Sequence, residues 1–435
     1  MPALLFLQLV CCVCFFSSIS VDAFRLSSSI SRYSSSYRQD QGDVCPLFST
    51  KEVSDTESSP PISPKVVTKE IMSFFKESAV YRGRNPGPAP MNIKNYLTRP
   101  DVVENLDGAH ISIIMFQCAR SRRMAKSLMP TSAMLEALQK WEKKSWSERD
   151  ISTFVYGIRA LDNTGVDENE GLMLKLVAKK IAESDAIMTS RSVGNALYGL
   201  QDITSDTEGA VELCAALAGK IKSSTGDLNG QDIGIGLYGL QGMSANAPEV
   251  RLLAAGLAEK IKQSDSELDA QAMSNALYGL QSMSSEHPEV CALVDALATK
   301  VSDSKPELCA QAIGSMLYGL QRLTTDEPEV RKLVAALAEK VEVSTMGLDA
   351  QAIGNALFGL QKMSSEYVEV RNLVGAIATK LVLLEVEMDS KGIGAALYGL
   401  HSMSSDEPQV RALLAALADR ISISKCNLSG QVRRV

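Results

Sequence analysis

Histidine and cysteine are the side chains most able to carry out chemistry here, and their placement points to no catalytic centre. The chain has 435 residues, nine of them cysteine and three of them histidine (His110, His287 and His401). The histidines fall in unrelated positions, and no Ser/His/Asp or Cys/His set and no phosphate loop is visible. Outside the N-terminal apolar run, the six remaining cysteines are scattered with no CxxC pair. We interpret them as reduced thiols, mostly small core residues, and expect no enzyme activity, no metal site and no cofactor.

Two sets of polar residues recur at a spacing of 40 residues and could form extended binding surfaces. The first set carries amide or hydroxyl groups and comprises Asn195, Asn275, Ser315 and Asn355. One such group per repeat could read one base edge, but asparagine could equally bond a neighbouring turn. The second set is basic in six successive copies: Lys220, Lys260, Lys300, Lys340, Lys380 and Arg420. A line of cations could follow a phosphate backbone, or each could complement the dipole of a helix that ends there.

An internal repeat must position these residues. The tetrapeptide Leu-Tyr-Gly-Leu ends at Leu200, Leu240, Leu280, Leu320 and Leu400, and Leu-Phe-Gly-Leu fills the remaining place at 357–360. Two degenerate copies precede these six, at 155–158 and 115–118, and a truncated ninth copy begins at Leu428. A period this regular predicts a solenoid.

Each copy predicts two helices joined by a turn. In residues 268–302, Asp269 is a good N-cap, and apolar residues then follow helical spacing over about 270–283. Pro288 suits the first position of a second helix that ends near Val301. Glycines inside each first helix indicate close approach of neighbouring helices. We therefore predict an all-α fold over residues 101–435, an α-solenoid of about eight 40-residue helix-turn-helix repeats forming a right-handed superhelix. The predicted repeats are 106–145, 146–187, 188–227, 228–267, 268–307, 308–347, 348–387 and 388–427, with a partial copy at 428–435.

The segment Gln-Ala-Met-Ser-Asn-Ala-Leu-Tyr-Gly-Leu at 271–280 resembles the signature of octotricopeptide repeats, which are helical-pair repeats of nominally 38 residues. The Pro-Glu-Val at 288–290 is similar to the repeat start of that family, and the resemblance covers about residues 106–435. It implies sequence-selective binding of single-stranded organellar RNA in RNA processing, stability or translation. This chain departs from the family in its period of 40 and in ending at Val435 without the RAP domain that many relatives carry. We therefore carry over RNA binding but no cleavage activity.

The charge of the repeats favours a different partner. The chain has a formal net charge of −7, and residues 186–425 hold 19 basic against 30 acidic residues. An acidic array must gather its cations on one face to bind a polyanion. The alternative is a protein–protein interaction scaffold of armadillo or tetratricopeptide type. Neither hypothesis involves a small-molecule substrate.

The N-terminal region reads as a targeting signal in two parts. An apolar run and Val21-Asp22-Ala23 predict a signal peptide over 1–23, and a Ser- and Arg-rich, acid-poor segment follows over 24–39. The junction before Phe24 resembles the presequences of plastid proteins in algae with secondary plastids, which implies a plastid location. Secretion and the mitochondrion are the alternatives, and the mature form is expected to lack a membrane segment. Residues 40–100 read as a flexible linker with at most one short helix, over 66–78.

Overall fold

The computed structural model describes residues 63–80, 89–119, 132–140, 146–161, 168–383 and 387–423, and these belong to one compact unit. Over these ranges the backbone is helical, and the β-structure is limited to one isolated bridge between Thr189 and Thr225. The predicted all-α fold is confirmed. The two N-terminal targeting segments and the partial repeat at 428–435 lie outside the described residues.

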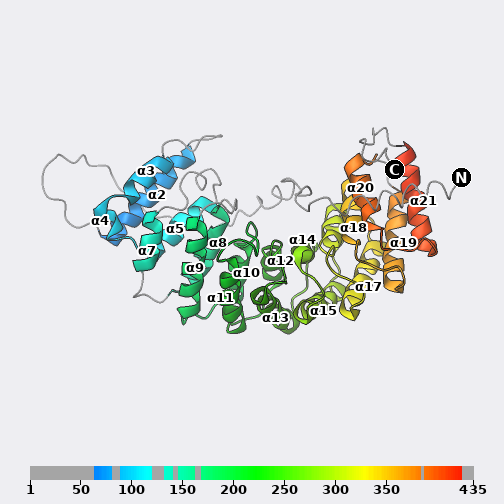
Figure 1. Ribbon diagram of the computed structural model, residues 1–435, viewed down its shortest axis with the longest axis horizontal. Helices are drawn as coiled ribbons and strands as arrows, with labels where there is room; N and C mark the ends of the chain where they lie inside the picture. The colour runs from blue at the N-terminus through cyan, green and yellow to red at the C-terminus, as the bar shows by residue number, and fades with distance from the viewer. Residues whose placement is uncertain are drawn as a thin grey trace. The chain divides into compact units, whose positions relative to one another are not determined.

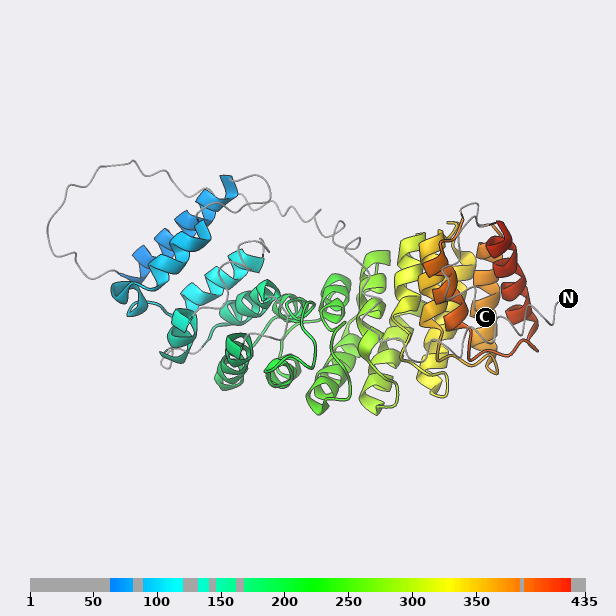
Figure 2. The same cartoon turned by 45° about the horizontal axis from the view of Figure 1, so that its top comes forward.

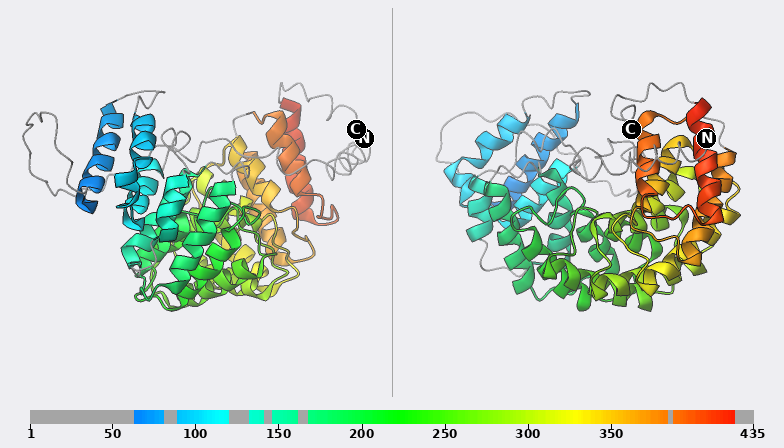
Figure 3. Two further views of the ribbon diagram at one scale, coloured as in Figure 1. Left: turned by 60° about the vertical axis from the view of Figure 1, so that its left-hand side comes forward. Right: turned by 45° about the vertical axis from the view of Figure 1, so that its right-hand side comes forward.

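The helices form two layers, as the prediction of helix pairs requires (Figures 1 and 2). The first-helix layer contains α5 (Gly108–Ala119), α8 (Glu148–Gly157), α10 (Ser190–Tyr198), α12 (Gly230–Tyr238), α14 (Ala270–Tyr278), α16 (Ala310–Tyr318), α18 (Ala350–Gly359) and α20 (Ser390–Gly399). The second-helix layer contains α7 (Ser132–Lys140), α9 (Glu168–Glu183), α11 (Ala210–Lys222), α13 (Pro248–Gln263), α15 (Pro288–Asp303), α17 (Pro328–Val343), α19 (Val368–Val382) and α21 (Pro408–Ile423). Each helix packs on its counterparts in adjacent repeats, so α14 contacts α12 and α16 while α15 contacts α13 and α17. The unit is therefore an α-solenoid, with the first-helix layer on the inner side of the curved stack (Figure 3).

Local sequence sets where each first helix begins and ends. Asp269 accepts a hydrogen bond from the backbone N–H of Ala272 at 2.7 Å, and equivalent side-chain caps begin α8, α10, α12, α18 and α20. Cys309 makes no such bond before α16. Helix α14 ends at Tyr278 rather than near Met283 as predicted, because its last turn is a separate 3-10 helix, η5 (Gly279–Ser282). The 3-10 helix η4 (Ile158–Ala160) follows α8 in the same way.

The linker predicted over residues 40–100 is replaced, where the structure describes it, by helices that join the core. These helices are α2 (Pro64–Val80), α3 (Ala89–Leu97) and α4 (Pro100–Val103). Val67, Ile71, Ile93 and Leu97 are fully buried, and α2 contacts both α3 and α5. The short helix predicted over 66–78 corresponds to α2, whereas α3 and the packing of both helices into the core were not predicted, because the buried stripe of α2 needs α3 and α5 as its partners.

The recurring glycine of the Leu-Tyr-Gly-Leu segment allows the first helices to approach one another closely. A β-carbon built on Gly319 would lie 1.9 Å from the carbonyl oxygen of Leu277 in the preceding repeat, and Gly279 would meet the oxygen of Leu237 at 2.0 Å. Carbon and oxygen cannot come so near without a shift of the backbone. The expected packing role of this glycine column is therefore what the geometry shows.

Candidate functional site

The solvent-facing side of the first helices presents one polar strip in each repeat. In α10 the strip consists of Arg191, Asn195 and Tyr198, which are four and three residues apart and so share one face of the helix. The first position is exposed in all six clear repeats, where it holds Arg191, Gln231, Gln271, Gln311, Gln351 and Lys391. Stacking of the repeats aligns these strips along the solenoid, and Figure 3 shows that the first helices lie on the inner side of its curve. We call this surface the first-helix face.

The predicted amide column lies in the middle of this face. Asn195, Asn275 and Asn355 are half-buried, and their side-chain amides form no hydrogen bond with any described residue. Ser315, in the same column, is buried with 9% of its surface exposed. Ile235 and Ala395 take the same place in the other two repeats, so the amides alternate with residues that cannot pair with a base edge. The three asparagines are thus half-buried polar side chains on the first-helix face.

A continuous aromatic ladder runs beside the amide column. Its members come from eight successive first helices: Phe116, Tyr156, Tyr198, Tyr238, Tyr278, Tyr318, Phe358 and Tyr398. Neighbouring ring centroids lie 5.4–6.1 Å apart, and the last four pairs of rings are stacked. Burial raises the pKa of Tyr278 and of Tyr318. The sequence showed the tyrosine column, but the stacking of its rings follows only from the close packing of the first helices.

Polar side chains accompany the rings in the N-terminal half of the aromatic ladder. The guanidinium carbon of Arg159 lies 5.0 Å from the ring centroid of Tyr156 and 4.6 Å from that of Tyr198. In the repeats that follow, Gln241 donates a hydrogen bond to the backbone oxygen of Gln201, and Gln281 donates to the side-chain oxygen of Gln241 at 3.2 Å. These bonds link successive repeats and hold the polar edge of the face in register.

The first-helix segments differ in charge from the rest of the solenoid. The first helices and their closing turns, at 190–205, 230–245, 270–285, 310–325, 350–365 and 390–405, hold four basic residues and two acidic ones, a net charge of +2. The basic residues are Arg191, Arg322, Lys362 and Lys391, and all four are exposed. Of the two acidic residues, Asp232 is buried. The excess of acidic residues therefore lies on the second helices and the loops.

The predicted basic column lies elsewhere and is held by the backbone. The ammonium group of Lys260 donates to the carbonyl oxygen of Ser224 at 2.7 Å, and that of Lys340 donates to Ser304 at 2.6 Å. Lys220, Lys300 and Lys380 make the same bond to Ser184, Ser264 and Ser344. Each serine follows the preceding second helix, so each lysine meets the negative end of a helix dipole one repeat away. Arg420 occupies the sixth place and is half-buried. This geometry favours the helix-dipole interpretation of the column.

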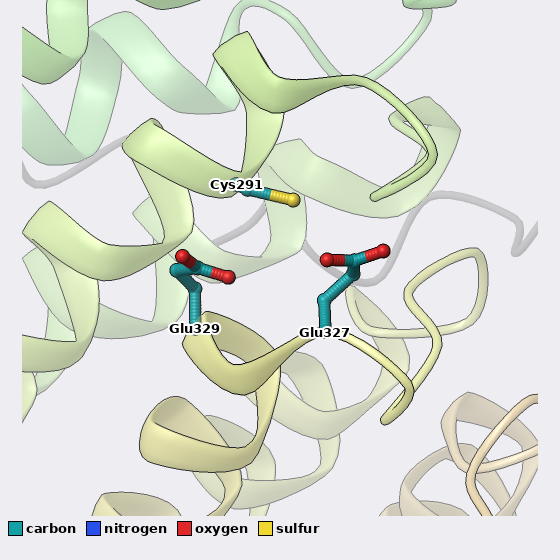
Figure 4. Close-up of side chains that lie close together, drawn as sticks. All are labelled: Cys291, Glu327 and Glu329. Carbon is teal, nitrogen blue, oxygen red and sulfur yellow. The ribbon is translucent and has the colours of Figure 1, made fainter.

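The described part of the chain contains four of the nine cysteines. Cys118, Cys214 and Cys291 are buried and Cys309 is exposed, all as free thiols. One cluster of possible metal ligands occurs among the described residues: Cys291, Glu327 and Glu329, with one ligand atom each within 4.8 Å of the others (Figure 4). Burial, together with both carboxylates, raises the pKa of Cys291 to about 11. The sulfur donates a hydrogen bond to the backbone oxygen of Ser285 at 3.1 Å, so it is a thiol and not the thiolate that binds metals.

No family model and no curated protein sequence matches the chain. Among the described helices, none is both long enough and apolar enough to cross a lipid bilayer.

Proposed function

We propose that this protein is a non-catalytic helical-repeat protein that binds single-stranded RNA on the first-helix face. The observation that carries the proposal is the separation of charge, with first-helix segments of net charge +2 in an array whose net charge is −11. A polyanion can approach this face without meeting the acidic second helices. The three asparagine amides supply donors and acceptors for base edges, and the resemblance of the repeat to octotricopeptide repeats supports the same ligand.

The structure changes which cations we expect to contact phosphate. The ammonium groups of the lysine column already donate hydrogen bonds to backbone carbonyls, whereas Arg322, Lys362 and Lys391 are exposed in three successive repeats. Arg191 extends the positive charge toward the N-terminal repeats. We therefore expect the phosphates to follow these residues, with the strongest contacts in the three C-terminal repeats.

Binding of a labelled random-sequence RNA, measured by fluorescence anisotropy at several salt concentrations, tests the proposal. Each neutralised phosphate contributes about −0.7 to the slope of log affinity against log salt. Changing Arg322, Lys362 and Lys391 to Gln should weaken binding and flatten the slope by about two. The matched control changes Lys260, Lys300 and Lys340 to Gln and should leave the slope unchanged. If the wild type shows no salt-dependent RNA binding, the protein–protein scaffold becomes the better hypothesis.

Sequence selectivity needs a separate measurement. Selection from a random RNA pool with the wild type and with a variant carrying Ala at Asn195, Asn275 and Asn355 should give different sequence preferences. We expect the variant to lose preference at three positions, at about 1–3 kcal/mol each by analogy with bidentate base contacts, while affinity for the unselected pool changes little. An unchanged preference would remove the asparagines from the proposed site.

We also propose a plastid location in an alga with a secondary plastid, with RNA processing, stability or translation as the process served. The support is the two-part composition of residues 1–39. A fusion of residues 1–45 to a fluorescent protein should enter the plastid, and Phe24→Ala should divert much of it to an earlier secretory compartment. Full plastid import after that change would contradict the role assigned to Phe24.

A further inference from the structure

Four repeats hold an arginine side chain in the same clamp near the start of the second helix. Arg331 of α17 donates from one guanidinium nitrogen to the backbone oxygens of Thr325 and Asp326, at 2.7 and 2.9 Å. These oxygens belong to the turn that precedes the helix. The equivalent arginines, Arg251, Arg371 and Arg411, each make the same two bonds at 2.7–3.1 Å. The two turn carbonyls are thus one wall of a guanidinium site that recurs through the array.

The following repeat supplies the other wall. At Arg251, Arg331 and Arg371, one residue that lies 36 or 38 positions after the arginine contacts the guanidinium group. Nε of Arg371 lies 3.5 Å from a carboxylate oxygen of Glu407, and Nε of Arg251 lies 4.0 Å from one of Glu289. Tyr367 closes the site of Arg331, with its ring centroid 4.7 Å from the guanidinium carbon. Carbonyls on one side and a carboxylate or ring on the other therefore define the clamp.

One repeat keeps both walls but lacks the arginine. Cys291 occupies the arginine position in α15, and the residues 36 and 38 positions later are both acidic, Glu327 and Glu329. Figure 4 shows the two carboxylates beside the cysteine, from the N-terminal end of α17. Because cysteine is much shorter than arginine, a cavity of about 450 Å³ remains, and Ser285 and Glu286 of the preceding turn line it.

We propose that this cavity binds the guanidinium group of an arginine side chain presented by a partner protein. The walls offer what three sister repeats use to hold a guanidinium, and this repeat is acidic at both positions where each of those three has one acidic residue. Lys262 also borders the cavity, but its ammonium group lies 3.2 Å from the carboxylate of Asp295, and Lys332 lies 2.8 Å from the same carboxylate. The lining therefore keeps a net negative charge that suits a cation. A planar fork of N–H donors fits paired oxygens on two sides better than a compact ammonium does.

Calorimetric titration of the full chain with the tripeptide acetyl-Gly-Arg-Gly-amide tests the site. We expect a dissociation constant on the order of 1 mM for so small a ligand, with no binding of the citrulline peptide and at least tenfold weaker binding of the lysine peptide. Glu327→Gln and Glu329→Gln should each weaken binding about tenfold. Free arginine should bind no more tightly than the tripeptide, because the site recognises only the side chain.

Two reciprocal exchanges between repeats serve as matched controls. Cys291→Arg should fill the cavity from within, abolish binding of the tripeptide and raise the melting temperature, which also shows that the variant folds. Arg371→Cys should open an equivalent cavity beside Glu407 and create a second, weaker site for the tripeptide. Undiminished binding to the Cys291→Arg variant would overturn the proposal. So would a wild type that binds Zn²⁺ through Cys291 and does not bind the tripeptide, since that result would make the cluster a metal centre.

Discussion

Alanine in place of Gly319 tests whether close approach of the first helices holds the array together. The new β-carbon would lie 1.9 Å from the oxygen of Leu277. Reaching the roughly 3.3 Å at which such groups normally touch requires a separation of about 1.4 Å between two backbones. Overpacking of a core costs about 1–3 kcal/mol, and we place this change at the upper end because neither contacting atom belongs to a flexible side chain. Replacing glycine by alanine within a helical turn returns about 0.5–1 kcal/mol, so the net loss should be about 2 kcal/mol.

Gly219→Ala provides the matched control. Gly219 lies in α11, and a β-carbon added to it would have no other atom within 4 Å. That variant should be more stable than the wild type by about 0.5–1 kcal/mol. Hydrogen exchange is the suitable measurement, because repeat arrays open locally and couple mainly to their neighbours. Gly319→Ala should accelerate exchange in α14 and α16, and equal protection in the two variants would refute the packing argument.

Three further changes follow from the same contacts. The variant with Gln at Lys260, Lys300 and Lys340 loses charged bonds to helix-end carbonyls, so its free energy of unfolding should fall by about 1 kcal/mol per site. Thermal denaturation measures this change, and an unaltered melting temperature would mean that these bonds contribute nothing to stability. Asp232 is buried with one carboxylate oxygen unpartnered, and burial raises its pKa, so Asp232→Ala should stabilise by about 1–2 kcal/mol at pH 7. That gain should shrink in urea titrations as the pH falls toward 3.8, because protonation relieves the penalty in the wild type. Burial lowers the pKa of His110, but its bonds to Asp107 and to the oxygen of Pro64 outweigh burial and raise the pKa above 6.5 overall. The stabilisation of the fold by protonated His110 should therefore be complete below pH 6.5 and decline as the pH rises through the raised pKa. Thermal melts of the wild type and of His110→Gln across this range should converge at high pH, and parallel curves would contradict the assignment.

The helices and the solenoid class of this protein follow from the regular repeat in its sequence. A period of 40 residues, capping side chains such as Asp269 and Asp349, and prolines such as Pro288 mark the helices before any contact is known. The glycine column at Gly279 and Gly319 also announced close packing, because glycine inside a helix is otherwise unfavourable. The solenoid class was predictable for this reason, since each repeat needs contacts only with its neighbours.

The roles of the polar columns depended on the third dimension. In the sequence, the periodic basic column that contains Lys300 was the candidate for phosphate binding, and Arg322 did not stand out. Only stacking carries Lys300 to the carbonyl of Ser264 while it leaves Arg322 exposed on the other layer. The site around Cys291 likewise could not be predicted from the sequence, because its walls come from a turn before the helix and from the next repeat. Sequence periodicity determines which residues share a column, but the neighbouring repeat determines which atoms each of them meets.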